Sequence, residues 1–270
     1  MADPERSSSY WLRAAQAGLQ LHGAEPAAHR YDRHAHDDYS VILVTEGAKI
    51  LRVGKQRHEV RSGQIVVINP GESHECEPLR GAEWAHRCWY LRPDAAAAVT
   101  GEPSEGLRSF RSPVIDDPAL ALALRKAHAA GPDTTDGTGD LRQLWTLSAL
   151  FDRTEAAKAK TTGKASRARA ELYRHLLTKS LDERLDLDAL AQAAGVTRFQ
   201  VIRDVNRSYG MSPAVFLRNL RLREAQRLIR EHTPLVEVSA ETGFADQSHF
   251  CRSFKGAFGV TPTAYRAAFH

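Results

Sequence analysis

Histidines supply the first candidate chemistry in this chain of 270 residues. His34 and His36 are separated by one residue, and His74 follows in the stretch NPGESH. Neutral imidazole is a common ligand of iron, nickel and zinc, and it also takes part in hydrogen bonds with organic molecules. Three roles are therefore open for these side chains: holding a metal ion, hydrogen-bonding an effector, or supporting the core.

Arginines near the carboxyl end supply a second candidate chemistry, the recognition of base pairs. Arg203 and Arg252 occupy matching positions in two similar stretches, and a guanidinium can make a bidentate contact to guanine. Gln247 can pair with adenine in the same way. A salt bridge or a phosphate contact is the alternative for either arginine.

The two similar stretches are GVTRFQVIRDVNRSYGMSPAVFLR, residues 195–218, and GFADQSHFCRSFKGAFGVTPTAYR, residues 243–266. Each predicts a glycine turn after a short helix, then a second helix with apolar residues at i and i+4. Those inward residues are Val201 with Val205 in the first copy and Phe250 with Phe254 in the second. The pattern is typical of a helix-turn-helix, whose second helix enters the major groove.

Helical phase then predicts which side chains face DNA, because they must lie opposite the inward pairs. The predicted DNA-binding residues are Arg198, Phe199, Ile202, Arg203 and Asn206 in the first copy, and Gln247, Ser248, Cys251, Arg252 and Lys255 in the second.

Capping signals delimit the helices of this half. Asp186 or Asp188 predicts one helix start and Thr197 the next, and Gly195 and Gly210 predict helix ends. A hydroxyl residue followed by proline predicts three further starts, at Ser212-Pro213, Thr233-Pro234 and Thr261-Pro262. The first of these opens a long arginine-rich helix to about Glu231, which we interpret as a core-packed spacer with a solvated basic face.

Charge separates the two halves of the chain. Residues 157–270 hold 19 Lys and Arg against 11 Asp and Glu, a net charge of +8, whereas residues 1–156 have a net charge of −4. A basic module of about a hundred residues favours a polyanionic partner, because neutralised phosphates release counterions. The alternative is an ordinary solvated basic surface.

The amino-terminal half has a different pattern. Short β-rich runs between residues 39 and 92 are punctuated by Gly, Pro and Asn, which predicts a small antiparallel sandwich or barrel. Two helices follow, at about 117–130 and 141–154. The second is predicted to bury a stripe that consists of Leu141, Leu144, Trp145, Ser148 and Phe151. The small, basic stretch after it reads as a linker.

The carboxyl-terminal half resembles the AraC/XylS family of bacterial transcription regulators over about residues 167–269. The most specific part is the second copy of the repeated stretch. In the first copy, Val205 stands where the family usually has phenylalanine, which changes a core position only. The resemblance supports the same DNA-facing residues.

Residues 30–93 resemble the cupin-type effector domain of the same family, from the H-x-H to the NPGESH turn. The candidate effector-binding residues are His34, His36, Tyr39, His74, Trp84 and Trp89. Cupin enzymes add a carboxylate ligand shortly after the H-x-H, but that position falls on Ser40 or Val41 here. Asp37, Asp38 and Cys76 could replace it only in a different geometry, so His34, His36 and His74 are metal candidates with an incomplete ligand set.

Together these observations predict an α+β protein of two domains. An N-terminal jelly-roll or cupin domain with a helical dimerisation segment occupies residues 1–155, a linker 156–169, and an all-α domain with two helix-turn-helix motifs 170–269. We expect a cytoplasmic homodimer, without a membrane segment and without catalytic residues. Its three cysteines predict reduced, structural thiols.

The expected partners are an operator in double-stranded DNA, a small-molecule effector of unknown identity and, for an activator, RNA polymerase. No cofactor is assigned. The alternative is a metal-dependent cupin enzyme, or a metal sensor, fused to a DNA-binding module.

Overall fold

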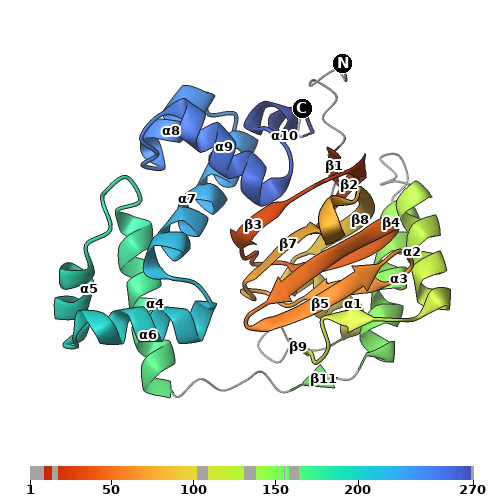
Figure 1. The fold of residues 1–270 in the computed structure, drawn as a ribbon, viewed down its shortest axis with the longest axis horizontal. Coiled ribbons are helices and arrows are strands. Elements are labelled where there is room, and N and C mark those ends of the chain that lie inside the picture. The colour runs from red at the N-terminus through yellow and green to blue at the C-terminus, as the bar shows by residue number, and fades with distance from the viewer. Residues whose placement is uncertain are drawn as a thin grey trace. The chain divides into compact units, whose positions relative to one another are not determined.

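The computed structural model describes residues 9–13, 18–101, 109–130, 138–154, 156–157 and 164–268. Two compact units are present, one built mainly from residues up to 159 and one from residues 160–266 together with residues 32–35. The first is mostly strands with a few helices and the second is helical, which confirms the predicted fold class (Figure 1). No helix in the described ranges has the length and apolar character that crossing a bilayer requires.

Strand β4 (Tyr39–Val53) organises the first unit. Its first part pairs with β6 and β8, and its second part pairs with β5 and β7. The change of partners falls at Gly47, whose φ is 67° and where a Cβ would lie 2.2 Å from the carbonyl oxygen of Glu83. Only glycine fits such a close approach of two backbones. The strand therefore turns a corner there and contributes to both layers of a jelly roll.

The path of hydrogen-bonded strands runs β1-β2-β8-β4-β6-β10, and β3 pairs with β7 beside it. A separate small pair joins β9 to β11. The strands are β1 (Ser9–Arg13), β2 (Leu19–Ala27), β3 (Tyr31–His34), β4 (Tyr39–Val53), β5 (Gln56–Arg61), β6 (Ile65–Ile68), β7 (His74–Pro78), β8 (Trp84–Leu91), β9 (Ser109–Phe110), β10 (Val114–Ile115) and β11 (Ala156–Ala157). The strands before residue 39 were not predicted from the sequence.

Alternation along β4 divides the core of this unit in two. Val41 and Leu43 face helices α2 (Pro118–Ala130) and α3 (Thr138–Arg153) and belong to one apolar cluster with them. Ile42 and Val44 face the other way and belong to a second cluster, on the inner face of the jelly roll. A short helix, α1 (Pro93–Thr100), also contacts α3.

The predicted stripe on α3 is confirmed in part, because Phe151 is buried and Leu144 packs against the same core cluster, but Trp145 is not buried. The helix buries Gln143, Leu147, Leu150 and Phe151, whereas Trp145 is 80% exposed. The reason is Gln143, whose amide oxygen accepts a hydrogen bond from Trp89 Nε1 at 2.8 Å and whose amide nitrogen donates to the carbonyl of Ala127. A polar residue with both ends bonded can lie in a buried stripe, which hydrophobic periodicity alone does not detect. The side chain of Leu141 lies outside the described residues.

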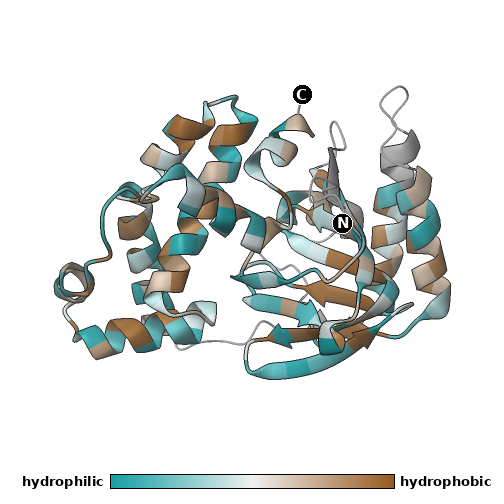
Figure 2. Cartoon of the chain, turned by 45° about the horizontal axis from the view of Figure 1, so that its top comes forward, coloured by the Kyte–Doolittle hydropathy of each residue, from teal (hydrophilic) through white to brown (hydrophobic). Residues whose placement is uncertain are grey.

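The second unit consists of seven helices in the described residues, and Figure 2 shows apolar and polar residues alternating along them. Asp186, Thr197 and Ser212 cap three of the helices with their side chains, as predicted. The helices are α4 (Lys164–Lys179), α5 (Leu187–Ala194), α6 (Arg198–Tyr209), α7 (Pro213–Arg230), α8 (Leu235–Glu241), α9 (Gln247–Phe258) and α10 (Pro262–Ala267).

One predicted helix start differs. Thr261 caps α10 through Ala264 N, but α8 begins at Leu235 with no side-chain cap from Thr233. The backbone N–H of Thr233 instead donates to Leu228 O at 3.0 Å and closes the end of α7. Thr233 therefore ends one helix and does not start the next.

The predicted linker, residues 156–169, overlaps helix α4, which begins at Lys164. Ser166 Oγ and Arg169 both bond the carboxylate of Asp204 on α6. These residues therefore belong structurally to the helical unit. Residues 158–163 lie outside the described ranges, and the domain boundaries stay a prediction.

Candidate nucleic-acid interface and effector site

Helices α5 and α6 form the first helix-turn-helix. Val201 and Val205 are fully buried against Leu190 and its neighbours, which fixes the rotation of α6. All five residues predicted to face DNA from this helix are exposed, and Phe199 is 76% exposed. Phe199 and Ile202 thus present apolar side chains on the same exposed side of α6 as Arg203.

Helices α8 and α9 form the second helix-turn-helix. Phe250 and Phe254 are fully buried, with their ring centroids 5.7 Å apart, and Phe258 continues the stack at 4.6 Å from Phe254. Four of the five predicted DNA-facing residues are exposed, and Cys251 is half-buried. Each predicted set therefore lies on one side of one helix.

The arginines of the helical unit fall into two groups. Arg221 donates to Leu181 O and Glu183 O, and Arg227 pairs with Glu224 and Glu231. By contrast, Arg203 and Arg252 are exposed, and within the described residues neither is in a hydrogen bond or an ion pair. The salt-bridge alternative for these two therefore has no partner among the described side chains. Arg198 does have one, because its Nε lies 3.1 Å from Asp188 Oδ1.

A buried carboxylate holds α6 in place. Asp204 is 1% exposed and accepts hydrogen bonds from Ser166 Oγ at 2.8 Å, Gln200 Nε2 at 2.8 Å and Arg169 Nε at 2.6 Å. Burial opposes ionisation of this group, but the three donors outweigh burial and lower the pKa of Asp204. The charged form is thereby favoured, and it ties α6 to α4.

The two motifs are packed together through a loop between α4 and α5. Gly243, in the turn of the second motif, has φ 69°, and a Cβ there would lie 2.4 Å from the carbonyl oxygen of Leu181. Arg221 on α7 donates to that carbonyl at 2.8 Å and to Glu183 O at 2.7 Å. The loop at 181–183 thus contacts both α7 and the turn between α8 and α9.

Of the three candidate histidines, His36 and His74 lie in the strand unit, where His74 begins β7. His34 ends β3 and is grouped with the helical unit, where its ring centroid lies 6.4 Å from that of Phe258. Two of the rings, those of His36 and His74, have centroids 5.3 Å apart.

The other predicted effector residues do not all join them. Trp84 belongs to the inner-face cluster of the jelly roll. Tyr39 and Trp89 lie on the opposite face, in the cluster with α2 and α3. Trp89 is held there by its hydrogen bond to Gln143 and by an edge contact with His128 at 5.0 Å. Trp84 therefore lies on the opposite face of the sheet from Tyr39 and Trp89. The sequence could not show this, because the face to which each strand residue points was not known.

Two inner-face residues were missed from the sequence. Lys49 is 1% exposed, with Nζ 4.4 Å from the ring centroid of Trp84, and burial lowers the pKa of its ammonium. His86 stacks on the same Trp84 at 4.8 Å, and its Nδ1 has no hydrogen-bond partner among the described residues. In the run AKILRV, Lys49 alternates in phase with Leu51 and Val53. Residues two apart in a strand point to the same face, so this spacing could have predicted that Lys49 is buried.

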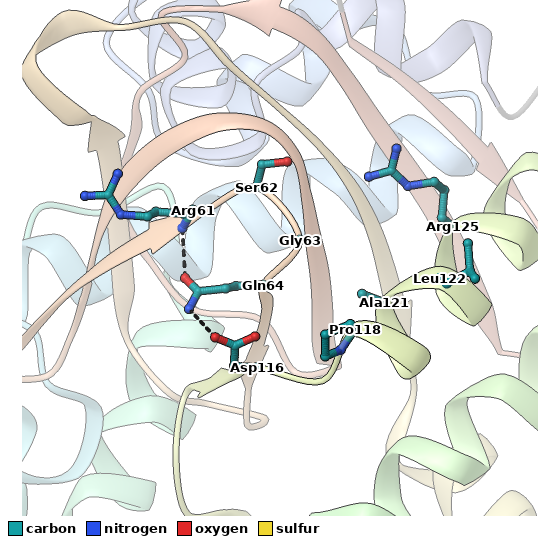
Figure 3. Close-up of a pocket in the computed structure, with 9 residues that line it drawn as sticks. All are labelled: Arg61, Ser62, Gly63, Gln64, Asp116, Pro118, Ala121, Leu122 and Arg125. Carbon is teal, nitrogen blue, oxygen red and sulfur yellow. Dashed lines mark hydrogen bonds between the residues drawn. The ribbon is translucent and has the colours of Figure 1, made fainter.

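A surface hollow of about 570 Å³ lies beside the start of α2 (Figure 3). Its wall contains Gln64, which accepts from the backbone N–H of Arg61 at 2.9 Å and donates to Asp116 at 3.3 Å. Arg125 and Leu122 on α2 lie on another side of it. None of the six predicted effector residues lines this hollow.

Known protein families match both the strand-rich part and the helical part of the chain. Residues 16–176 match the AraC-like ligand binding domain, and residues 190–268 match a helix-turn-helix domain. The chain belongs to the AraC family of transcription regulators. The first match begins after β1 and extends into α4, and the second runs from within α5 to the end of α10.

Two curated HTH-type transcription regulators are similar to this chain over most of their length. An uncharacterised HTH-type transcriptional regulator of Bacillus subtilis, YbfI, is 23% identical over 82% of this chain and 81% of its own. The transcriptional activator RhaS of Pectobacterium carotovorum is 22% identical over 87% of this chain and 88% of its own.

Solved structures show the same fold. Fatty-acid-bound ToxT from Vibrio cholerae superposes with a TM-score of 0.58 at 12% identity, over 96% of this chain and 93% of ToxT. At this identity the likeness concerns the fold alone.

Proposed function

We propose that this AraC-family chain is a transcription regulator that binds an operator through both helix-turn-helix motifs and responds to a small molecule bound by its strand domain. The observation that carries the proposal is the pair of exposed helix faces, each with an arginine that no described residue engages. The net charge of +8 beyond residue 156 supports a polyanionic partner.

The DNA contacts divide by chemistry. Arg203 and Arg252 suit bidentate contacts to guanine, and Gln247 suits adenine. Phe199 and Ile202 offer apolar contact to thymine methyl groups or sugar edges. Arg198 and Lys255 suit phosphate, where position matters and base identity does not.

The effector site is proposed for the inner face of the jelly roll. Of the predicted residues, His36, His74 and Trp84 provide polar and aromatic groups there, and Lys49 adds a buried amine. ToxT, which shares the fold, has been solved with an unsaturated fatty acid bound. An effector shifts the regulator between states only by binding one of them more tightly.

We also propose that the protein acts as a homodimer and has no catalytic activity of its own. Trp145 on α3 is 80% exposed and Leu122 on α2 is 53% exposed, which supports these helices as the dimerisation surface. RNA polymerase is a further partner if the protein activates transcription, and a DNA-binding regulator works in the cytoplasm. The curated relatives carry the names of transcription regulators, in support of a non-enzymatic role.

An unbiased selection tests the main proposal. The full chain is incubated with random duplexes at moderate ionic strength, and bound DNA is sequenced after several rounds. We expect enrichment of a motif with two conserved blocks about one helical turn apart, since successive major-groove faces repeat every roughly 34 Å. A folded chain that enriches no motif would refute the proposal.

A further inference from the structure

A hollow of about 730 Å³ lies in the helical unit, between its two helix-turn-helix motifs. Its wall has three parts: the loop around Arg184 that precedes α5, the first half of α7 at residues 214–221, and the segment 240–249 with the turn of the second motif. All three parts belong to the same compact unit. None of the ten residues predicted to face DNA lines this hollow, so the proposed base contacts leave its role open.

Three arginines line the hollow, and they differ in what they contact. Arg221 donates to two carbonyl oxygens of the loop before α5 and so holds that loop against α7. Arg184 is exposed and Arg218 is half-buried, and neither is in a hydrogen bond or an ion pair with any described residue. Among the described residues that line the hollow, Asp182 is the one carboxylate. The hollow therefore carries an excess of positive charge.

The hollow adjoins both helices that are proposed to read DNA. His249 in its wall is exposed and lies three residues before Arg252, so these two side chains occupy neighbouring positions on α9. On the opposite wall, the loop around Arg184 leads into α5, where Asp188 in the first turn contacts Arg198 of α6. The loop therefore supports the amino-terminal end of one reading helix, and the other wall contains that of the second.

The geometry of a duplex determines which groups face this position. Two helices that enter successive major grooves on one side of B-DNA lie about 34 Å apart along its axis. The minor groove lies between those two major grooves, and a sugar–phosphate strand runs along each of its edges. Phosphate groups therefore face the part of the protein between the two motifs. Guanidinium groups suit phosphate because their N–H donors match its oxygens.

We propose that the hollow binds the sugar–phosphate backbone of the operator between its two recognition blocks, with Arg184 and Arg218 each contacting one phosphate. This inference rests on the proposed function, because it requires both motifs to bind adjacent major grooves. Ala214, Ala240 and Ala245 give the wall small exposed side chains, so a strand of DNA can approach closely. Such contacts fix the position of the duplex and carry no sequence information.

Binding to a duplex of mixed sequence isolates these contacts, because phosphate contacts do not depend on base identity. The full chain is titrated with this labelled duplex, and with the selected operator, at several salt concentrations by fluorescence anisotropy. Each phosphate contact contributes about 0.9 to the slope of log affinity against log salt, which corresponds to about 8-fold in affinity at 0.1 M salt. We expect Arg184→Ala and Arg218→Ala each to lose about this much on both duplexes.

Arg227→Ala is the matched control. It removes the same charge from α7 outside the hollow, where Arg227 is paired with Glu224 and Glu231. This variant should keep the parental slope. Arg184→Lys and Arg218→Lys should recover most of the slope, because an ammonium group also neutralises a phosphate, whereas a purely structural role of the guanidinium would not be restored. Circular dichroism shows whether each variant is folded.

The outcomes separate this inference from the proposed function. Parental slope and affinity in folded Arg184→Ala and Arg218→Ala proteins would overturn the phosphate site and leave operator recognition by Arg203 and Arg252 intact. A loss confined to the selected operator would also overturn it, because the arginines would then read bases. A folded parent chain that binds neither duplex would overturn both the inference and the proposed function.

Discussion

At the scale of single residues, equivalent glycines of the two motifs have different surroundings. Gly195 and Gly243 both adopt positive φ, 61° and 69°, after the first helix of their motif. A Cβ at Gly195 would meet no atom within 4 Å, whereas one at Gly243 would overlap the backbone at Leu181 and Asp182. Gly195 is therefore needed only for the conformation of its turn. Gly243 is needed for its turn and also for the close packing of that turn against residues 181 and 182.

This difference predicts unequal costs of substitution. Gly195→Ala should destabilise the helical domain by about 1 kcal/mol, the usual cost of a side chain at positive φ. Gly243→Ala should cost at least about 2 kcal/mol more, because the Leu181–Asp182 backbone must move. Urea unfolding followed by circular dichroism measures both, and equal costs would contradict the packing described for Gly243.

Helical phase predicted the buried pairs Val201–Val205 and Phe250–Phe254 and the exposed faces opposite them, because that information is local. It could not separate Arg203 and Arg252 from Arg221. The partners of Arg221 are carbonyls of residues 181 and 183, about 40 positions away in sequence. Whether an arginine can contact DNA therefore depends on tertiary contacts, which the local sequence pattern does not show.

At the scale of elements, helix caps were predictable and strand neighbours were not. Asp186, Thr197 and Ser212 cap their helices through hydrogen bonds to residues two or three positions ahead. By contrast, β4 pairs with four other strands, and its corner at Gly47 depends on the distant Glu83 backbone. Sequence alternation indicated a barrel or sandwich but gave no register, so Tyr39 and Trp89 were grouped with residues of the other face.

Helix α3 presents the surface that we assign to dimerisation. Its buried side is occupied by Leu147, Leu150 and Phe151, which leaves Trp145 exposed beside α2. Trp145→Ala should weaken the dimer by about 2 kcal/mol or more, roughly 30-fold in dissociation constant, as for a hot-spot tryptophan. Sedimentation equilibrium measures this constant.

Phe199→Ala is the control for that experiment, since Phe199 is similarly exposed but lies in the DNA-facing set. It should leave the dimer unchanged. A Trp145→Ala protein with the parental dissociation constant would place the interface elsewhere.

At the scale of the whole molecule, buried histidines make the stability of the strand unit depend on pH. The strand unit buries His22, His86 and His128, and burial is the main cause that lowers the pKa of His22 to about 3 and of His128 to about 4. The pKa of His86 is also held well below its ordinary value by burial. In the unfolded chain all three titrate near the ordinary value of about 6.5.

Below pH 6.5 the unfolded strand unit therefore binds protons that the folded unit excludes, so its stability falls with falling pH until the folded groups titrate near pH 4. Each histidine contributes about 1.4 kcal/mol per pH unit, so the loss between pH 7.5 and 5.5 should reach as much as about 4 kcal/mol. His128→Gln should remove about a third of it.

Tryptophan fluorescence during urea unfolding isolates this effect, because all four tryptophans of the chain lie before residue 155. A free energy of unfolding that does not change over this pH range would contradict the burial of these imidazoles.

The central claim is that Arg203 and Arg252 contact base edges from two adjacent helix faces. Its most direct measurement is the affinity of the full chain for its selected duplex, compared among Arg203→Ala, Arg252→Ala and the control Arg227→Ala, whose guanidinium is occupied by Glu224 and Glu231. We predict that the first two each weaken specific binding by about 1–3 kcal/mol and relax base preference at one position, while the control binds as the parent does. Parental affinity and unaltered preference in both Arg203→Ala and Arg252→Ala would contradict the claim.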